Sequence, residues 1–194
     1  MSKIAIIGGG NLGAAIAKGL LKTTDIHPAQ IYITRNKIER LDYLKQQGVV
    51  VSRDNVFAVK AAEIIILAVK PYKILEVLDE IAPHLEAHHI LASVATGIRL
   101  SQIKSKLNAV LPVFRLMPNT AIEIQESITC LCAEDASKEH IEKIQILCNS
   151  LGESILIEEE LMEAATVLGA CGIAFVLRFI RAMMQAGIEI GFDA

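Results

Sequence analysis

The sequence contains no tryptophan and few other aromatic residues, with three tyrosines and five phenylalanines in 194 residues. Hydrophobic residues nevertheless make up 53% of the chain. The apolar content is therefore mainly aliphatic, which is typical of stacked parallel strands and packed helices. Because this fraction is high for a soluble monomer, we expect part of the apolar surface to be covered by a partner subunit.

Cysteines are also few, and none lies in a Cys-x-x-Cys pair or near a histidine at metal-ligand spacing. The four are Cys130, Cys132, Cys148 and Cys171. We therefore expect free thiols in a reducing cytoplasm and no metal site. Basic residues do not cluster and the net charge is -3, which argues against nucleic acid as a partner. No signal peptide precedes the first apolar run, so we expect a cytoplasmic protein.

Long uncharged apolar runs are missing too. The longest one near the end covers residues 164–177, which is 14 residues, before Arg178 and Arg181 interrupt it. Because a helix needs about 20 apolar residues to span a bilayer, we expect no membrane partner. The pattern instead predicts a long helix over residues 161–188, apolar nearly all round from Ile173 onward. Such a helix needs cover on several sides.

What the sequence does contain begins with a buried strand predicted over residues 3–7. Gly8, Gly10 and Gly13 follow in a G-x-G-x-x-G pattern, and an apolar helix comes directly after them. The first glycine permits a sharp turn, the second lets a pyrophosphate approach the backbone, and the third lets the helix pack on the strand. We interpret this turn as a dinucleotide site at the helix N-terminus, the alternative being a glycine turn that binds nothing.

The residues after the second predicted strand, residues 31–34, indicate which dinucleotide binds. NAD-binding folds place an Asp or Glu here, where it holds the ribose 2′-hydroxyl. This chain has Thr34, Arg35, Asn36 and Lys37 instead. Because two cations suit a 2′-phosphate, the pattern favours NADP(H), with NAD(H) as the alternative cofactor. The competing explanation is that Arg35 is a solvated loop charge.

Apolar runs at residues 49–51, 64–69, 90–94, 110–116, 127–132 and 154–157 predict further strands, most of them separated by helical segments. This alternation predicts an α/β fold with a Rossmann-type doubly wound sheet. Residues 64–69 are fully apolar, so we expect a central strand, and ligands bind at the carboxyl ends of such strands. Lys70 and the small residues Ala95, Thr96 and Gly97 are therefore candidate site residues.

Several segments together resemble the pyrroline-5-carboxylate reductase family, which catalyses the last step of proline synthesis. The segments are IGGGNLG at residues 7–13, AVKP at 68–71, ATG at 95–97, RLMPNT at 115–120 and LMEA at 161–164. The resemblance covers essentially the whole chain. It implies a Rossmann-type domain over residues 1–160, followed over residues 161–194 by the start of a helical dimerisation domain. That domain forms a homodimer or higher homo-oligomer in the family.

The resemblance also implies a reductase that transfers a hydride from NAD(P)H to the C=N bond of 1-pyrroline-5-carboxylate, giving L-proline without a metal. Because the protonated C=N bond is already electrophilic, positioning carries most of this reaction, and no catalytic residue is assigned. Asn119 is implied to lie near nicotinamide and substrate. The implied cofactor contacts are Ile7, Gly8, Gly9, Gly10, Asn11, Leu12, Thr34, Arg35, Asn36, Asn55, Ala68, Val69, Lys70, Pro71, Val94, Ala95 and Thr96.

The sequence departs from the family pattern in two places. The family signature S-G-S-G-P-A-Y is replaced by G-A-C-G-I-A-F at residues 169–175. The family also continues beyond the position of Ala194 with more helices and a substrate-binding loop. We therefore expect a part of a longer protein or a shortened, divergent member. Two other functions stay open: a non-catalytic NADP(H)-binding or regulatory paralogue, and a reductase of another imine or keto acid.

Overall fold

The computed structural model describes residues 2–193 and is built around an eight-stranded sheet with the order β3-β2-β1-β4-β5-β6-β7-β8. The strands are β1 (Ile4–Ile7), β2 (Ile31–Thr34), β3 (Val50–Ser52), β4 (Ile64–Leu67), β5 (Ile90–Ser93), β6 (Val113–Met117), β7 (Ser127–Glu134) and β8 (Gly152–Leu156). Strands β1 to β6 run parallel, β7 is antiparallel to β6, and β8 is parallel to β7. The predicted doubly wound sheet is confirmed.

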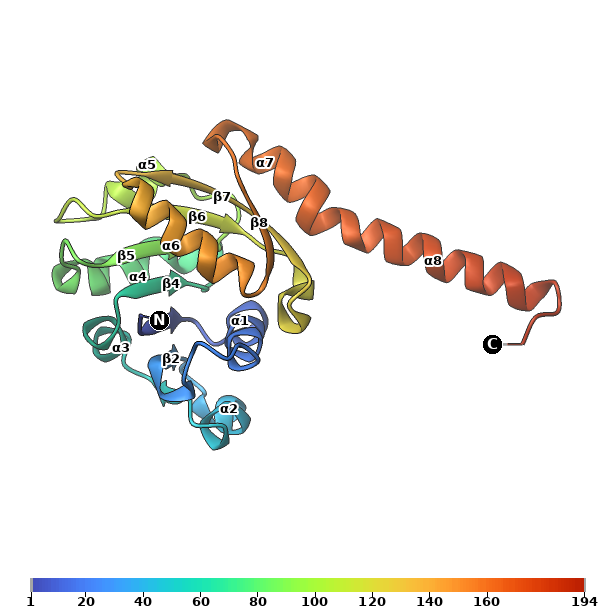
Figure 1. Ribbon diagram of the computed structural model, residues 1–194, viewed down its shortest axis with the longest axis horizontal. Coiled ribbons are helices and arrows are strands. Elements are labelled where there is room, and N and C mark those ends of the chain that lie inside the picture. Colours follow the sequence, from blue (N-terminus) through green and yellow to red (C-terminus); the bar gives the residue numbers. More distant parts are fainter. Residues whose placement is uncertain (1, 194) are drawn as a thin grey trace.

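Helices cover both faces of this sheet (Figure 1). The α-helices are α1 (Asn11–Leu21), α2 (Asp42–Gln46), α3 (Asn55–Ala61), α4 (Ile74–Ile81), α5 (Leu100–Lys104), α6 (Lys138–Asn149), α7 (Met162–Ala165) and α8 (Gly172–Glu189). Ile4 and Ile6 of β1 join a core with α1, α2 and α6, while Ala5 and Ile7 join another with α3, α4 and α5. Because successive side chains point to opposite faces, a strand buried on both sides is apolar throughout.

Some element bounds differ from the prediction. Strand β6 starts at Val113 rather than at residue 110, and it continues through Met117 because the residue before Pro118 favours extended backbone. Strand β8 starts at Gly152, whose φ of 139° disfavours any residue with a side chain. These shifts leave the sheet order unchanged.

The C-terminal region leaves the sheet and projects away from it (Figure 1). A π-helical turn, η7 (Thr166–Cys171), lies between α7 and α8. Glu159–Glu189 forms one helical stretch of 31 residues, with a mean hydropathy of 1.8 in its most apolar window, which is 0% buried. By length and composition this helix could cross a membrane. Arg178 and Arg181 end the 14-residue uncharged run but lie inside this helix, as the predicted helix over residues 161–188 requires, so the helix exceeds the length expected from the uncharged run alone.

A buried ion pair joins this region to the sheet. The Arg115 side chain on β6 is 5% exposed, and its guanidinium donates to Glu159 Oε1 at 2.7 Å. The same oxygen accepts from the backbone N–H of Leu100 at the start of α5, at 2.8 Å. Met162 of α7 is fully buried beside them in the core. The start of the helical region is thus fixed to the sheet, whereas α8 is not.

Candidate functional site

The predicted site segments follow the ends of adjacent strands. Gly8 comes after β1, Arg35 after β2, Ala68 after β4 and Val94 after β5. Because these strands are parallel, the segments meet at one edge of the sheet. The backbone N–H of Ala68 donates to the carbonyl of Ile7 at 2.8 Å, and Val94 donates to Leu67 at 3.1 Å. The structure therefore brings together residues that the sequence separates by up to 86 positions.

The glycine turn forms a cradle that side chains would fill. Gly8 has a φ of 110°, and a Cβ there would lie 2.8 Å from the backbone of Ala68. A Cβ on Gly13 would overlap the carbonyl oxygen of Gly8. Gly10 is the N-cap of α1 and makes no side-chain cap, and open space lies where its Cβ would be. The uncapped amides of α1 are therefore accessible to an anion, as a pyrophosphate requires.

A chain of hydrogen bonds holds this turn in place. The Gly8 N–H donates to Thr34 Oγ1 at 3.3 Å, and the Thr34 hydroxyl donates to Asn55 Oδ1 at 2.6 Å. Asn55 at the start of α3 in turn donates to Glu80 at 2.9 Å. Thr34 is only 2% exposed, so its hydroxyl holds the glycine turn from the buried side. Asn36, which was also predicted to contact the cofactor, is exposed.

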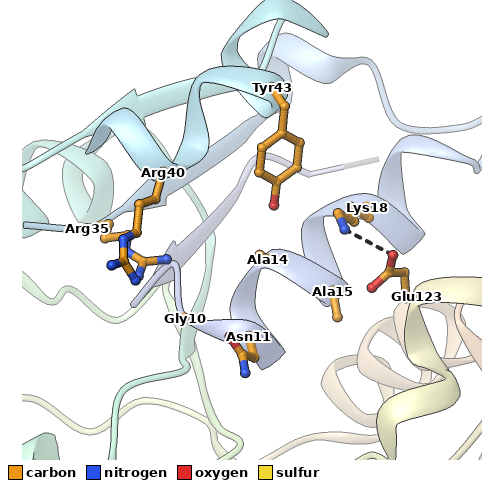
Figure 2. A pocket seen from close by; sticks show the side chains of 9 residues that line it. All are labelled: Gly10, Asn11, Ala14, Ala15, Lys18, Arg35, Arg40, Tyr43 and Glu123. Carbon is orange, nitrogen blue, oxygen red and sulfur yellow. Dashed lines mark hydrogen bonds and ion pairs between the residues drawn. The ribbon is translucent and has the colours of Figure 1, made fainter. Parts of the chain in front are cut away.

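A pocket of about 360 Å³ opens beside the glycine turn, along α1 (Figure 2). Three cations and one carboxylate line it, together with a tyrosine ring. The Arg35 guanidinium donates to the carbonyl of Gly9, and Lys18 pairs with Glu123 at 3.0 Å. The lining residues are Gly10, Asn11, Ala14, Ala15, Lys18, Arg35, Arg40, Tyr43 and Glu123. An excess of positive charge next to a phosphate-binding turn suits an additional phosphate.

Sequence reasoning identified Arg35 but missed the other charged residues of this pocket. Arg40 lies on a 3-10 helix, η2 (Ile38–Leu41), within a segment between two predicted strands. Its side chain lines the same pocket as that of Arg35 (Figure 2). The five-residue spacing between the two arginines was the available signal. Glu123 reaches the pocket from 105 residues beyond Lys18, and no local pattern marks it.

The segments after β4, β5 and β6 lie further along the same edge. Lys70 and Thr96 are exposed, and Val94 and Ala95 are buried. Asn119 opens the 3-10 helix η5 (Thr120–Ile124): its Oδ1 accepts from the Ala121 N–H at 3.0 Å, and its own N–H donates to Ser127 Oγ at 3.1 Å. The Asn119 side chain is thus held in one orientation at the end of β6.

Metal-ligand groups do not gather around this edge. Within residues 2–193, no group of three or more His, Cys, Asp or Glu side chains is placed to hold a metal ion. All four cysteines are free, and Cys171 alone among them is exposed. Burial raises the pKa of the Cys132 thiol to about 11, so that side chain is a neutral thiol at pH 7.

Two family models match the chain. Residues 3–97 match "NADP oxidoreductase coenzyme F420-dependent", and residues 159–194 match "Pyrroline-5-carboxylate reductase dimerisation". Together they cover the glycine turn, the first five strands and the long C-terminal helix. The predicted domain boundary at residue 160 stays a prediction.

Among solved structures, the chain is similar to a pyrroline-5-carboxylate reductase from Coxiella burnetii, with a TM-score of 0.91 and 28% identity, covering 99% of this chain and 72% of that one. The Plasmodium falciparum pyrroline carboxylate reductase, solved with NADP bound, shares the fold at a TM-score of 0.90 and 24% identity, over 99% of this chain and 71% of that one.

Curated relatives carry the same name. Pyrroline-5-carboxylate reductase 2 of Dictyostelium discoideum is 38% identical over 98% of this chain and 69% of its own length. Its Bacillus subtilis (strain 168) namesake is 35% identical over 100% of this chain and 70% of that protein. The chain spans only 37% of pyrroline-5-carboxylate reductase 1 of Dictyostelium discoideum, at 38% identity over 98% of the chain. The chain therefore belongs to the pyrroline-5-carboxylate reductase family of NAD(P)-dependent oxidoreductases.

Proposed function

We propose that this protein transfers a hydride from NAD(P)H to the C=N bond of 1-pyrroline-5-carboxylate, yielding L-proline. Family membership supports the reaction. The observation that carries it is the meeting of the glycine turn, the AVKP segment and the Asn119 turn at one edge of the sheet. Because some relatives are much longer than this chain, the proposal concerns the full-length gene product.

The cofactor site in this proposal consists of the sequence-predicted contacts and Arg40. The open N-terminus of α1 binds the pyrophosphate, because the glycines leave its amides uncovered. Residues 68–71 and 94–96 flank the nicotinamide, which when bound provides the hydride. Thr34 and Asn55 contribute by holding the turn through their hydrogen-bond chain.

We favour NADP(H) over NAD(H) because of the charges in the pocket beside the turn. Arg35 and Arg40 both line this pocket (Figure 2), and Lys18 adds a third cation. The hydrogen bond that Lys18 donates to Glu123 raises the pKa of Lys18, so this lysine stays charged at neutral pH. Guanidinium groups bind phosphate oxygens in two-point contacts, which an unmodified ribose hydroxyl cannot match.

On the substrate side, Asn119 orients the ring rather than moving a proton. Its amide oxygen is occupied by the Ala121 N–H, and its amide nitrogen donates to no protein group within residues 2–193. Two N–H donors are therefore available for the carboxylate of the substrate. Because the imine nitrogen is already protonated, this site requires orientation more than acid or base catalysis.

We further propose that residues 161–194 form a homo-oligomer interface, and that the protein is cytoplasmic. Phe175, Phe179 and Met183 of α8 are each more than 60% exposed, and the dimerisation model matches this region. Purification without detergent, followed by light scattering over a range of concentrations, tests both statements. A monomer at every concentration contradicts the interface, and recovery only in the membrane fraction contradicts the location and supports a membrane span.

The direct test of the reaction is oxidation of NADPH by the purified full-length gene product in the presence of 1-pyrroline-5-carboxylate. We expect turnover, and we expect the Arg35→Gln and Arg40→Gln double variant to raise the KM for NADPH by about 10- to 100-fold. The KM for NADH should change less than about threefold, because NADH lacks the phosphate. Arg53→Gln is the control, since Arg53 is exposed and pairs with Glu39 outside the pocket. Absence of turnover with both nucleotides overturns the proposal.

One observation favours a second function, a non-catalytic NADP(H)-binding or regulatory protein. The residues at 169–175 lack the hydroxyl groups of the family signature, and part of this segment forms the π-helical turn η7. Calorimetry separates the two functions: tight NADPH binding by the full-length protein without imine reduction supports the second. Turnover of a different imine or of a keto acid in a substrate screen would instead indicate a reductase with another substrate.

A further inference from the structure

Helix α1 contacts both the proposed cofactor and the turn formed by Asn119 and η5, on the proposed substrate side of the site. Along one side it packs against η5, the 3-10 helix that starts directly after Asn119. At Gly19 the two backbones approach so closely that a Cβ would lie 2.6 Å from the carbonyl oxygen of Ile122. Ile122 is 3% exposed and belongs to the same core as α1. Glycine at position 19 is therefore what allows η5 to lie against the helix.

Lys18 of α1 and Lys22, the residue directly after this helix, bind the same residue of η5. Lys18 Nζ lies 3.0 Å from the Glu123 carboxylate, and Lys22 Nζ donates to the Glu123 carbonyl at 2.8 Å. Figure 2 shows the Lys18–Glu123 pair at the end of the pocket away from the arginines. Glu123 thus has its side chain held by α1 and its backbone held by the residue that caps the end of α1.

The ends of η5 are fixed as well. Asn119 caps its beginning with its side-chain oxygen. At its end Gln125 adopts a left-handed conformation with a φ of 63°, and its side chain donates to the carbonyl of Ser150 at 2.9 Å. Held at both ends and along α1, the turn leaves the Asn119 side chain little freedom.

We propose that Lys18, Gly19 and Glu123 are positioning residues that set Asn119 relative to the glycine turn through α1. The same rigid helix then holds the cofactor phosphates at its N-terminus and the substrate-side amide along its length. This inference rests on the proposed function, because the proposed contact with substrate is what makes the position of Asn119 matter. Its physical part, the support of η5 by α1, can be tested without any ligand.

The first test is hydrogen exchange of the chain without ligand. The reporters are the amides of Ile122, Gln125 and Glu126, which donate within the turn. We expect Gly19→Ala to accelerate their exchange about tenfold or more, since the added methyl group displaces the Ile122 carbonyl. Lys18→Met and Glu123→Gln should each accelerate it about two- to fivefold, as the pair is half exposed.

Matched controls remove similar groups elsewhere. Gly187→Ala adds a methyl group where nothing lies within 4 Å. Lys106→Met breaks a comparable pair, 2.8 Å long and similarly exposed, with Asp79. Neither should alter exchange at residues 119–126. Equal exchange in the Lys18, Glu123 and control variants overturns the inference, as does acceleration spread over the whole chain. If Gly19→Ala does not fold, Lys18→Met and Glu123→Gln still test whether α1 supports η5.

The second test is kinetic and uses the full-length gene product. Glu123→Gln should raise the KM for 1-pyrroline-5-carboxylate about two- to fivefold. Lys22→Met removes the hydrogen bond to the Glu123 carbonyl without changing the lining of the pocket, so it should raise the same KM while the Kd for NADPH stays within about twofold. A change in the Kd for NADPH alone in Lys22→Met overturns the inference, since η5 would then act on the cofactor. If the protein shows no turnover at all, the proposed function fails, whereas the exchange experiment still decides whether α1 positions the turn.

Discussion

The sheet and the C-terminal helix are both strongly apolar, yet their surroundings are opposite. Every residue of β1 is buried, while Phe175, Phe179 and Met183 of α8 are 61–70% exposed. The strands find their apolar partners within the chain, on both faces of the sheet. Helix α8 finds none within residues 2–193, where it has no buried residue. Apolar residues therefore stabilise the fold in one region and remain exposed in the other, where we propose an interface.

The largest expected difference between the regions comes from truncating one apolar side chain in each. Ile66 on β4 is 2% exposed, so Ile66→Ala should lower the free energy of unfolding by about 2–5 kcal/mol. Phe179 is 66% exposed, so Phe179→Ala should change it by no more than about 0.5 kcal/mol in dilute protein. It should instead weaken self-association about tenfold or more.

Urea denaturation measures the first quantity and sedimentation equilibrium the second. Leu75, which is 37% exposed on α4, offers a control on the outer face of the sheet region. Leu75→Ala should leave self-association unchanged. If Phe179→Ala destabilises dilute protein as much as Ile66→Ala does, α8 has cover inside the chain, and the contrast between the regions is wrong.

The next effect lies at the junction of the two regions. Glu159→Gln leaves the Arg115 guanidinium without its carboxylate, although the side chain of Arg115 is 5% exposed. Breaking a buried pair from one side costs about 3 kcal/mol or more, and we expect about 2–3 kcal/mol here because Glu159 is 27% exposed. The start of the helical region should lose protection in hydrogen exchange.

Two comparisons identify the cause of that loss. Glu160→Gln changes the neighbouring carboxylate, which is exposed, and should have little effect on unfolding. Replacing both partners, Arg115→Met with Glu159→Leu, should recover part of the stability because no unpaired charge remains. A single variant no less stable than the parent would show that the pair does not hold the junction.

The sheet could be predicted from sequence because its signals are local. Apolar runs such as residues 64–67 mark buried strands, and the glycines at 8 and 13 mark a turn in which a side chain would clash with the backbone. The AVKP segment and Asn119 then fall at the same sheet edge, since parallel strands end together. Local pattern was enough wherever the fold places consecutive elements side by side.

The remaining features depend on contacts between distant segments. Arg40 lines the pocket from the 3-10 helix η2, and Glu123 reaches Lys18 across 105 residues. The pairing of Arg115 with Glu159 joins a strand to a helix start 44 residues later. The π-helical turn at residues 166–171 had no signal in the helical pattern around it. Such features follow from packing, which a single sequence does not reveal.

The smallest effect distinguishes the regions by pH, through His89 in the sheet region. This residue is 2% exposed, its Nδ1 accepts from the Glu86 N–H at 2.8 Å, and its Nε2 has no partner within residues 2–193. Burial, followed by the nearby His88, lowers the pKa of His89 below its ordinary value of 6.5. The unfolded chain therefore takes up a proton near pH 6.5, whereas the folded chain does so only at lower pH. The contribution of neutral His89 to the free energy of unfolding is therefore fully present above about pH 6.5, and it is lost as the pH falls below that value.

Because His89 binds a single proton, the free energy of unfolding can fall by at most about 1.4 kcal/mol per pH unit through this residue. His89→Asn keeps a side-chain acceptor for the Glu86 N–H but does not titrate, so its urea midpoint should fall less between pH 7 and pH 5. His27→Asn, at an exposed position, is the control and should retain the slope of the parent. An unchanged slope in His89→Asn would assign the acid sensitivity to other groups. Helix α8 carries no histidine. Lowering the pH from 7 to 5 should therefore destabilise the sheet region first, and α8 should lose structure only when the sheet region unfolds.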